Sequence, residues 1–103
     1  MKTPKSMEAK IIKGGGITSA EGFRAAGVAC GIKPRGEKDM ALIVSDVPAE
    51  VAATFTTNRV KAAPVKLSMR HARNGKVRGV VINSGCANAC TGVGGIADAK
   101  RCV

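Results

Sequence analysis

The hydrophobic positions of the chain form several short runs that suit strands. Residues 22–32 make an irregular apolar run, and residues 40–46 are apolar and rich in β-branched side chains. Residues 51–58, which follow Pro48, repeat this character. We expect a strand over each run, with the second and third strands paired as neighbours. The charged residues, proline and glycine within 33–39 predict the turn between the first two strands.

A helix is predicted to begin near Pro64. Proline is tolerated in the first turn of a helix, and Val65, Met69 and Ala72 then recur at the spacing of one helix face. Gly75, preceded by asparagine, is expected to end the helix because either residue can adopt the left-handed backbone of a helix cap.

Two further elements are expected towards the C-terminus. Residues 77–83 predict a strand whose apolar middle indicates burial on both faces. Residues 94–103 predict a helix that reaches Val103 without a cap or a loop. The whole pattern indicates an alternating α/β organisation. The uncapped end suggests a chain that stops within an element.

Composition limits the size and class of the protein. The 103 residues suit one small domain, and the hydrophobic share of 45% allows a core. No apolar run reaches about 18 residues, so no membrane span is expected. The basic N-terminus lacks the apolar centre of a secretion signal. We expect a cytoplasmic protein with a flexible tail over residues 1–14 and one domain over residues 15–103.

The chain is basic, with 17 Lys and Arg against 7 Asp and Glu and a formal net charge of +10. The basic residues are scattered, and the chain has two Phe with no Trp or Tyr. It therefore lacks the aromatic platform typical of proteins that bind single-stranded nucleic acid. We expect a solvated basic surface and no nucleic-acid partner. A more acidic partner that balances the charge is the alternative.

The cysteines and the histidine do not predict a metal site. The four cysteines stand at positions 30, 86, 90 and 102, and this spacing lacks the paired C-x2-C units of common zinc sites. Disulfides are not expected without a secretion signal, so the thiols are expected to be free and buried or half-buried. His71 is expected to be an exposed residue of the predicted helix.

Residues 81–95, VINSGCANACTGVGG, combine a strand end, a loop of small residues and a helix start. Backbone N–H groups at such a junction favour negative charge. The lysine of a phosphate loop and the G-x-G-x-x-G spacing are both absent. The Thr91 hydroxyl beside the Gly92 N–H instead suits an oxyanion hole, in which two donors stabilise an acyl-transfer intermediate. The structural alternative is a tight turn with Thr91 as the helix N-cap.

Three stretches of the chain, in this order, resemble the N-terminal part of the bifunctional ornithine acetyltransferase/N-acetylglutamate synthase family of arginine biosynthesis. They are GFRAAGVACGIKPRGEKDMALIVSD, ATFTTNRVKAAPV and VVINSGCANACTG. The resemblance runs from about Gly15 to the last residue. It implies an α/β fold that is the incomplete N-terminal portion of a layered αββα sandwich.

The resemblance also implies a reaction. Family members transfer acetyl from N-acetylornithine to glutamate through an acetyl-threonine intermediate, and some accept acetyl-coenzyme A as a substrate; no other cofactor is implied. The precursor cleaves itself before the threonine nucleophile, which then begins a β-chain. The two chains intertwine and form higher oligomers.

The family's oxyanion pair matches Thr91 and Gly92, which end an Asn-Ala-Cys-Thr-Gly motif. The Thr91 hydroxyl and the Gly92 N–H are the implied donors. The family usually has asparagine where this chain has Cys86, five residues before Thr91. The nucleophile of the family lies beyond the matched part, and the main substrate contacts lie mostly beyond it. No nucleophile is therefore expected in this chain, and its substrate-binding residues stay open.

Other polar residues are expected to hold turns and loops. They are Asp39, Asp46, Thr56, Thr57, Asn58, Asn83 and Ser84. For Thr56, Thr57 and Asn58, a role in shaping the site is the alternative.

Two functions of different classes stay open, and nucleic-acid binding through the net charge of +10, which strong salt-dependent binding to oligonucleotides would support, is a third alternative. The chain is either part of an acetyltransferase that is inactive until completed, or a short non-catalytic module that binds anions or a partner and lacks the nucleophile. The uncapped C-terminal helix favours the first.

Overall fold

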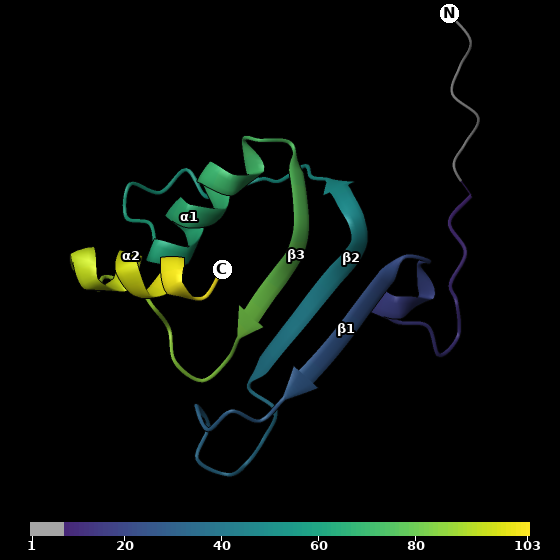
Figure 1. Cartoon of the computed structure of the whole chain (residues 1–103), viewed down its shortest axis with the longest axis horizontal. Helices are drawn as coiled ribbons and strands as arrows, with labels where there is room; N and C mark the ends of the chain where they lie inside the picture. Colours follow the sequence, from purple (N-terminus) through teal and green to yellow (C-terminus); the bar gives the residue numbers. More distant parts are fainter. Residues whose placement is uncertain (1–7) are drawn as a thin grey trace, which may run out of the picture.

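A computed structural model describes residues 8–103 as a three-stranded sheet with two helices (Figure 1). The elements in chain order are η1 (Ile17–Ser19), β1 (Phe23–Val28), β2 (Met40–Glu50), α1 (Ala63–Ala72), β3 (Lys76–Asn83) and α2 (Gly92–Arg101). The strands form one antiparallel sheet in the order β1-β2-β3. The expected mixture of strands and helices is therefore confirmed. Residues 1–7 of the predicted tail lie outside the described residues.

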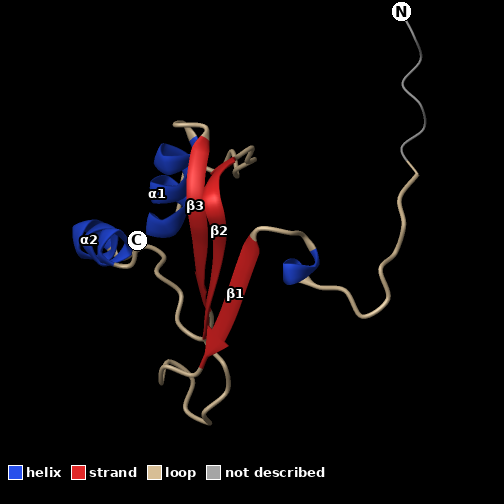
Figure 2. Ribbon diagram, turned by 45° about the vertical axis from the view of Figure 1, so that its right-hand side comes forward, coloured by secondary structure: helices blue, strands red, loops and turns tan. Residues whose placement is uncertain are grey.

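Both helices gather on the β3 side of the sheet. Figure 2 shows α1 beside β3 and α2 on the outer side of α1, while β1 forms the edge away from the helices. Contacts join α1 to both β3 and α2. The loop of residues 84–91 leaves the end of β3 and crosses to the start of α2, next to the first turn of α1 (Figure 1).

Strand β2 continues through Pro48, where the sequence pattern predicted a break between two strands. The ladder between β2 and β3 shifts register between Val44 and Ala49, which pair with Gly79 and Val77. Pro48 lies inside this irregular stretch. A proline is tolerated there because no ladder N–H is required of it. The strand therefore bends at Pro48 instead of ending.

The strand predicted over residues 51–58 is wrong. This segment is irregular, and β2 pairs with β1 and β3 instead. The Val51 N–H donates to the carbonyl oxygen of Gly75. Further along the segment, side chains accept hydrogen bonds from nearby backbone N–H groups. The Thr56 hydroxyl accepts from the Asn58 N–H at 3.1 Å, and Asn58 Oδ1 accepts from the Val60 N–H at 3.0 Å. These bonds satisfy the backbone without a partner strand.

Helix α1 forms where the hydrophobic spacing predicts it. Pro64 lies in its first turn, and Val65, Met69 and Ala72 are all half-buried. Gly75 follows the helix with φ +74°, a backbone region that strongly favours glycine, and its N–H donates to the carbonyl of Ala72 at 3.0 Å. The expected glycine at the helix end is confirmed.

Two expectations for the C-terminal half are corrected. Strand β3 is not buried on both faces, because Val80 and Ile82 are 52% and 47% exposed. Helix α2 begins at Gly92 and ends at Arg101, where the Cys102 N–H donates to the carbonyl of Ala99. Too few side chains from other elements therefore cover the apolar middle of β3 to bury it on both faces.

The buried interior is small. Within residues 8–103, the buried hydrophobic side chains are Ala63 and Ala99, one on each helix, and Gly95 of α2 is also buried. All four cysteines are free and exposed, which corrects the expectation of buried thiols. They lie in loops or beyond a helix end, outside this small interior. His71 is exposed, as expected.

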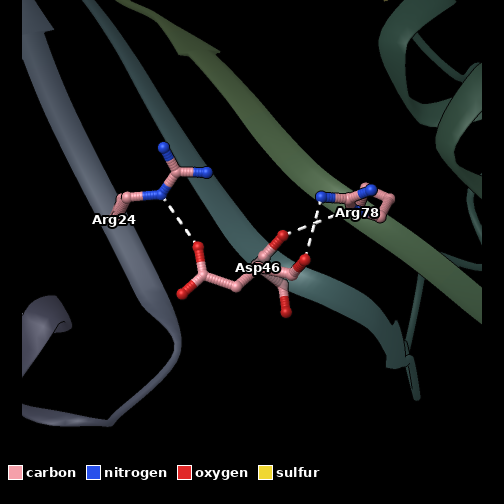
Figure 3. A network of polar contacts seen from close by, with 4 residues as sticks. Arg24, Asp46 and Arg78 are labelled. Atoms are coloured by element: carbon pink, nitrogen blue, oxygen red, sulfur yellow. Dashed lines mark hydrogen bonds and ion pairs between the residues drawn. The ribbon is translucent and has the colours of Figure 1, made fainter.

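Polar contacts link the three strands at one end of the sheet (Figure 3). Arg24 Nε of β1 lies 2.9 Å from Asp46 Oδ1 of β2. The Arg78 guanidinium of β3 donates to the carbonyl oxygens of Ser45 and Asp46 at 3.3 and 3.0 Å. The Asp46 carboxylate therefore pairs with an arginine of the neighbouring strand and does not cap a turn as expected.

Replacing Asp46 with asparagine is expected to lower the free energy of unfolding by less than about 1 kcal/mol. The side chains of Arg24 and Asp46 are 73% and 53% exposed, so water and salt screen their attraction. Urea unfolding at low and high salt measures this, with exposed Glu21→Gln as the control. A loss of more than about 2 kcal/mol would show that the pair is much stronger than its exposure indicates.

Candidate functional site

The predicted oxyanion pair lies at the start of α2. Thr91 is exposed and occupies the N-cap position, with φ −100° and ψ 4°, but its side chain makes no capping bond to the helix backbone. Gly92 is the first residue of the helix. Thr91 is therefore the N-cap by position alone. Capping of the helix therefore does not account for the hydrogen bonding of the Thr91 hydroxyl.

Gly92 is required here for its backbone conformation. Its φ is +65°, a region that strongly favours glycine, while a Cβ at this position would meet nothing within 4 Å. As the first residue of α2, its N–H has no acceptor inside the helix. The amino end of a helix also carries partial positive charge. The backbone at Gly92 thus provides a donor suited to a developing oxyanion.

The Thr91 hydroxyl is held by a neighbour that the sequence reading gave no role. Thr91 Oγ1 donates to Asn88 Oδ1, and Asn88 Nδ2 donates to the carbonyl oxygen of Gly95 at 2.7 Å. Asn88 is half-buried between the loop and the first turns of α2. The spacing of three between Asn88 and Thr91 was visible in the sequence, but the loop path that joins their side chains was not.

The backbone of the loop is shaped just before the pair. Cys90 has φ +55°, and no other non-glycine residue in the described part of the chain has a positive φ. Such a conformation costs a residue with a Cβ about 1–2 kcal/mol, so neighbouring contacts must hold it. Asn83 Nδ2 donates to the carbonyl oxygen of Cys86 at 2.9 Å, which confirms that Asn83 orders this loop.

Two hollows flank the loop. The smaller one, of about 290 Å³, is lined by Lys61, Ala63, Lys66, Cys90, Thr91, Gly92, Val93 and Ile96. The larger one, of about 550 Å³, is lined by Ala62, Pro64 and residues 83–89. The oxyanion pair therefore opens into a hollow that also carries two lysines. Sequence reasoning missed them because they come from the segment around the start of α1.

The lysines make the smaller hollow favourable for negative charge. Lys61 Nζ donates to the carbonyl oxygen of Asn58 at 2.7 Å, which holds this ammonium group near the hollow. Lys66 lines the same hollow from the first turns of α1. Two positive charges beside a helix amino end attract anionic ligands.

Asp39, which immediately precedes β2, supports the loop through its backbone and its side chain. Its carboxylate, in a residue only 2% exposed, accepts N–H groups from Cys30, Ile32 and Lys33 at 2.8, 2.7 and 2.9 Å. Its carbonyl oxygen accepts the Ser84 N–H at 2.8 Å. The expectation that Asp39 holds a turn is confirmed. The same residue anchors the first residue of the loop that leads to Thr91.

These backbone N–H groups hold the pKa of Asp39 well below its usual range, and the bond from the Cys30 N–H has the largest effect. The Asp39 carboxylate has the opposite effect on the pKa of the neighbouring Cys30 thiol. A hydrogen bond to Asp39, followed by desolvation, raises the pKa of Cys30. The Cys30 thiol is therefore poorly suited to act as a thiolate nucleophile.

Replacing Asp39 with asparagine is expected to lower the Tm at pH 7 and to weaken the effect of acid on stability. Because the folded-state pKa of Asp39 is lowered, its contribution is complete above the ordinary aspartate pKa of about 3.9 and declines as pH falls below it. The Tm difference between wild type and variant should shrink over this range. Asp98→Asn, an exposed change on α2, is the control. A difference that stays constant from pH 7 to pH 2 would contradict this role.

Across residues 8–103, no three His, Cys, Asp or Glu side chains are grouped so that they could hold a metal ion. In the same part of the chain, no helix is long and apolar enough to cross a membrane.

Comparison with known proteins identifies relatives. The model of the ArgJ family matches residues 24–103. The arginine biosynthesis bifunctional protein ArgJ of Thermobifida fusca is 55% identical over 85 residues, which cover 82% of this chain and 22% of that protein. The protein of the same name from Caldanaerobacter subterraneus is 59% identical over 86 residues, which cover 84% of this chain and 21% of that protein.

Solved structures share the fold. The chain matches ornithine acetyltransferase from Mycobacterium tuberculosis, solved in complex with ornithine, with a TM-score of 0.79 and 49% identity, over 85% of this chain and 46% of that one. It matches ArgJ from Bacillus halodurans with a TM-score of 0.81 and 46% identity, over 87% of this chain and 47% of that one. The expected α/β fold class is confirmed, as a part of the larger fold.

The chain spans about a fifth of the length of the curated relatives that it matches. The family model covers most of the chain, including the Thr91 loop, and the solved structures share the fold of that part. The chain belongs to the ArgJ family.

Proposed function

We propose that this chain is the N-terminal part of an enzyme that transfers acetyl from N-acetylornithine to glutamate in arginine biosynthesis. The observation that carries the proposal is the adjacent pair formed by the exposed Thr91 hydroxyl and the Gly92 N–H at the start of α2. The names of the relatives, which are bifunctional proteins of arginine biosynthesis, support the pathway. Acetyl-coenzyme A is a possible second acetyl donor, and the proposed reaction needs no further cofactor. The proposal includes a cytoplasmic location.

The proposed reaction has two symmetrical halves. A threonine hydroxyl outside this chain attacks the acetyl carbon of N-acetylornithine, so that a C–O bond forms and the carbonyl oxygen becomes an oxyanion. Collapse of this intermediate breaks the C–N bond, and ornithine leaves carrying on its nitrogen the proton that the threonine hydroxyl has lost. The amine of glutamate then attacks the acetyl-threonine, loses a proton and takes the acetyl group, which restores the threonine.

This chain contributes donors for the oxyanion of both halves. The Gly92 N–H is free of helix partners, and the Thr91 hydroxyl supplies the second donor once its proton turns from Asn88 towards the substrate oxygen. Donors that bind more strongly as charge develops lower the barrier to reaction. Lys61 and Lys66 favour the approach of substrates that carry carboxylates.

The proposed enzyme also needs a partner chain. Under this proposal the threonine nucleophile begins a β-chain made from the same precursor, and the two chains assemble into a higher oligomer. The exposed side chains Leu42, Val80 and Ile82 of the sheet are apolar surface that such an assembly would cover.

A non-catalytic anion-binding module is the second candidate. The helix start and the two lysines surround one hollow, and binding of an anion there needs no nucleophile. This candidate predicts binding of acetate or N-acetylornithine without acetyl transfer.

The first experiment is the intact mass of the native product in its source cells, with a search for a co-purifying chain that begins with threonine. The complete gene product, purified with any such chain, is then assayed with isotope-labelled N-acetylornithine and glutamate. A threonine-initiated partner and label in N-acetylglutamate support the acetyltransferase. A native product that has no partner, and that binds N-acetylornithine without transfer, supports the binding module and removes the acetyltransferase proposal.

A further inference from the structure

We infer that Asn88 is the positioning residue of the oxyanion pair, an inference that rests on the proposed acetyl transfer. Its amide side chain bonds to Thr91 on one side and to α2 on the other. Its Oδ1 and Nδ2 are engaged by Thr91 and Gly95, so Asn88 is assigned no direct bond to the substrate. It fixes where the Thr91 oxygen lies relative to the Gly92 N–H.

The orientation of the Asn88 amide is determined by its contact with the helix. Asn88 Nδ2 lies 2.7 Å from the carbonyl oxygen of Gly95, an acceptor that only the NH₂ end of the amide can satisfy. A flipped amide would place two oxygens against each other. Asn88 Oδ1 must therefore face Thr91, and the Thr91 hydroxyl must be the donor in that bond.

The three residues form one packed unit. A Cβ at Gly95 would overlap Thr91 Oγ1 and press on Asn88 Oδ1, so both side chains lie directly on the backbone of Gly95. Gly95 is buried, and its N–H donates to the carbonyl oxygen of Thr91 at 3.3 Å. The position of the hydroxyl oxygen is thus fixed from two sides: by the helix through Gly95 and by the loop through Asn88.

The chemistry of the acceptor gives Asn88 a further effect. A threonine hydroxyl has one proton, and here it is directed at the neutral amide oxygen of Asn88. An oxyanion is a stronger acceptor than a neutral amide oxygen, so the proton turns to the substrate oxygen as its charge develops. Asn88 therefore does not hold the proton back from the oxyanion, and its benefit to kcat comes from keeping the Thr91 oxygen beside the Gly92 N–H. A carboxylate at position 88 would compete with the oxyanion for this proton.

Asn88→Leu in the complete gene product is expected to lower kcat about tenfold, the effect of one lost hydrogen bond at the upper end of the usual range. KM for N-acetylornithine should change by less than about twofold, because the placement of the Thr91 donor matters for the charge that develops in the transition state and much less for substrate binding. Asn88→Asp keeps the shape and an acceptor, and we expect it to lower kcat as well, because the carboxylate retains the Thr91 proton. Exposed Asn74→Leu, beyond the end of α1, is the matched control and should leave kcat unchanged.

The decisive measurement is the same substitution in a Thr91→Val background, where no hydroxyl is left to position. If Asn88 acts through that hydroxyl, Asn88→Leu should cause no further loss of kcat there. An equal loss in both backgrounds would mean that Asn88 only stabilises the loop, and the inference would be overturned while the proposed function stands. Normal kcat in Asn88→Asp would overturn it too, even if Asn88→Leu does not fold. No effect of Thr91→Val itself would instead exclude the oxyanion role of Thr91 and with it this inference, whereas a wild-type product that transfers no acetyl group would remove the proposed function.

Discussion

Valine at position 91 is expected to lower kcat for acetyl transfer by about 100- to 1000-fold in the complete gene product, the range observed when one oxyanion donor is removed. Valine keeps the branched shape of threonine and removes only the hydroxyl that lies beside the Gly92 N–H. KM for N-acetylornithine should change much less, because the hydroxyl acts on charge that is present only in the transition state. Steady-state assays of the labelled acetyl group measure both constants.

Two further variants separate chemistry from folding. Thr91→Ser retains a hydroxyl and should recover most of the activity. Thr54→Val makes the same chemical change at an exposed position in the irregular segment after β2, and should leave kcat unchanged. If Thr91→Val retained full activity, the oxyanion role of Thr91 would be excluded. Equal losses in Thr91→Ser and Thr91→Val would point to packing, because one variant retains the hydroxyl and the other does not.

The pattern of the sequence predicted those elements whose causes are local. Helix α1 follows from a proline in its first turn, apolar residues on one face and Gly75 at its end, and each of these acts within a few residues. The turn held by Asp39 is also local, since the three N–H donors lie six to nine residues away. Such features appear in the structure as predicted.

The errors arise where pairing between distant segments decides the structure. Pro48 suggested a strand boundary. The register shift between β2 and β3 means that the ladder needs no N–H at this position, so the strand continues through the proline. Residues 51–58 have the composition of a strand, yet composition does not supply a neighbouring strand. The exposure of Val80 is a third case, because burial depends on which surfaces cover a strand and not on its apolar content.

The candidate site was likewise predictable from the sequence only where its residues are neighbours in the chain. The resemblance of the Thr-Gly motif to a known family directed attention to Thr91 and Gly92, and the structure places both at the start of α2. The role inferred for Asn88 depends on the loop path that returns its amide to Gly95, which a linear motif does not contain. Lys61 and Lys66 reach the hollow only because α1 begins beside the loop. The sequence thus predicted the candidate donor pair, and the structure shows the residues that surround it.

Gly95→Ala is expected to destabilise the protein by about 1–3 kcal/mol, the usual cost of forcing an extra methyl group into a packed site. The new Cβ would overlap Thr91 Oγ1, so the threonine would have to rotate and lose its bond to Asn88. Rotation would also carry the hydroxyl away from the Gly92 N–H. We therefore expect kcat for acetyl transfer to fall at least tenfold, since a displaced donor no longer meets the oxyanion. Urea unfolding and steady-state assays measure the two effects.

The neighbouring glycine provides a control with the opposite sign. Gly94 lies in the same turn of α2, but a Cβ there would meet nothing within 4 Å. Gly94→Ala should raise the free energy of unfolding by up to about 1 kcal/mol, because alanine loses less backbone entropy than glycine when a helix forms. Opposite shifts for two adjacent glycines cannot come from helix propensity, which is the same for both. If Gly95→Ala instead stabilised the protein as Gly94→Ala does, Thr91 would not be packed on Gly95, and the fixed position of its hydroxyl would be wrong.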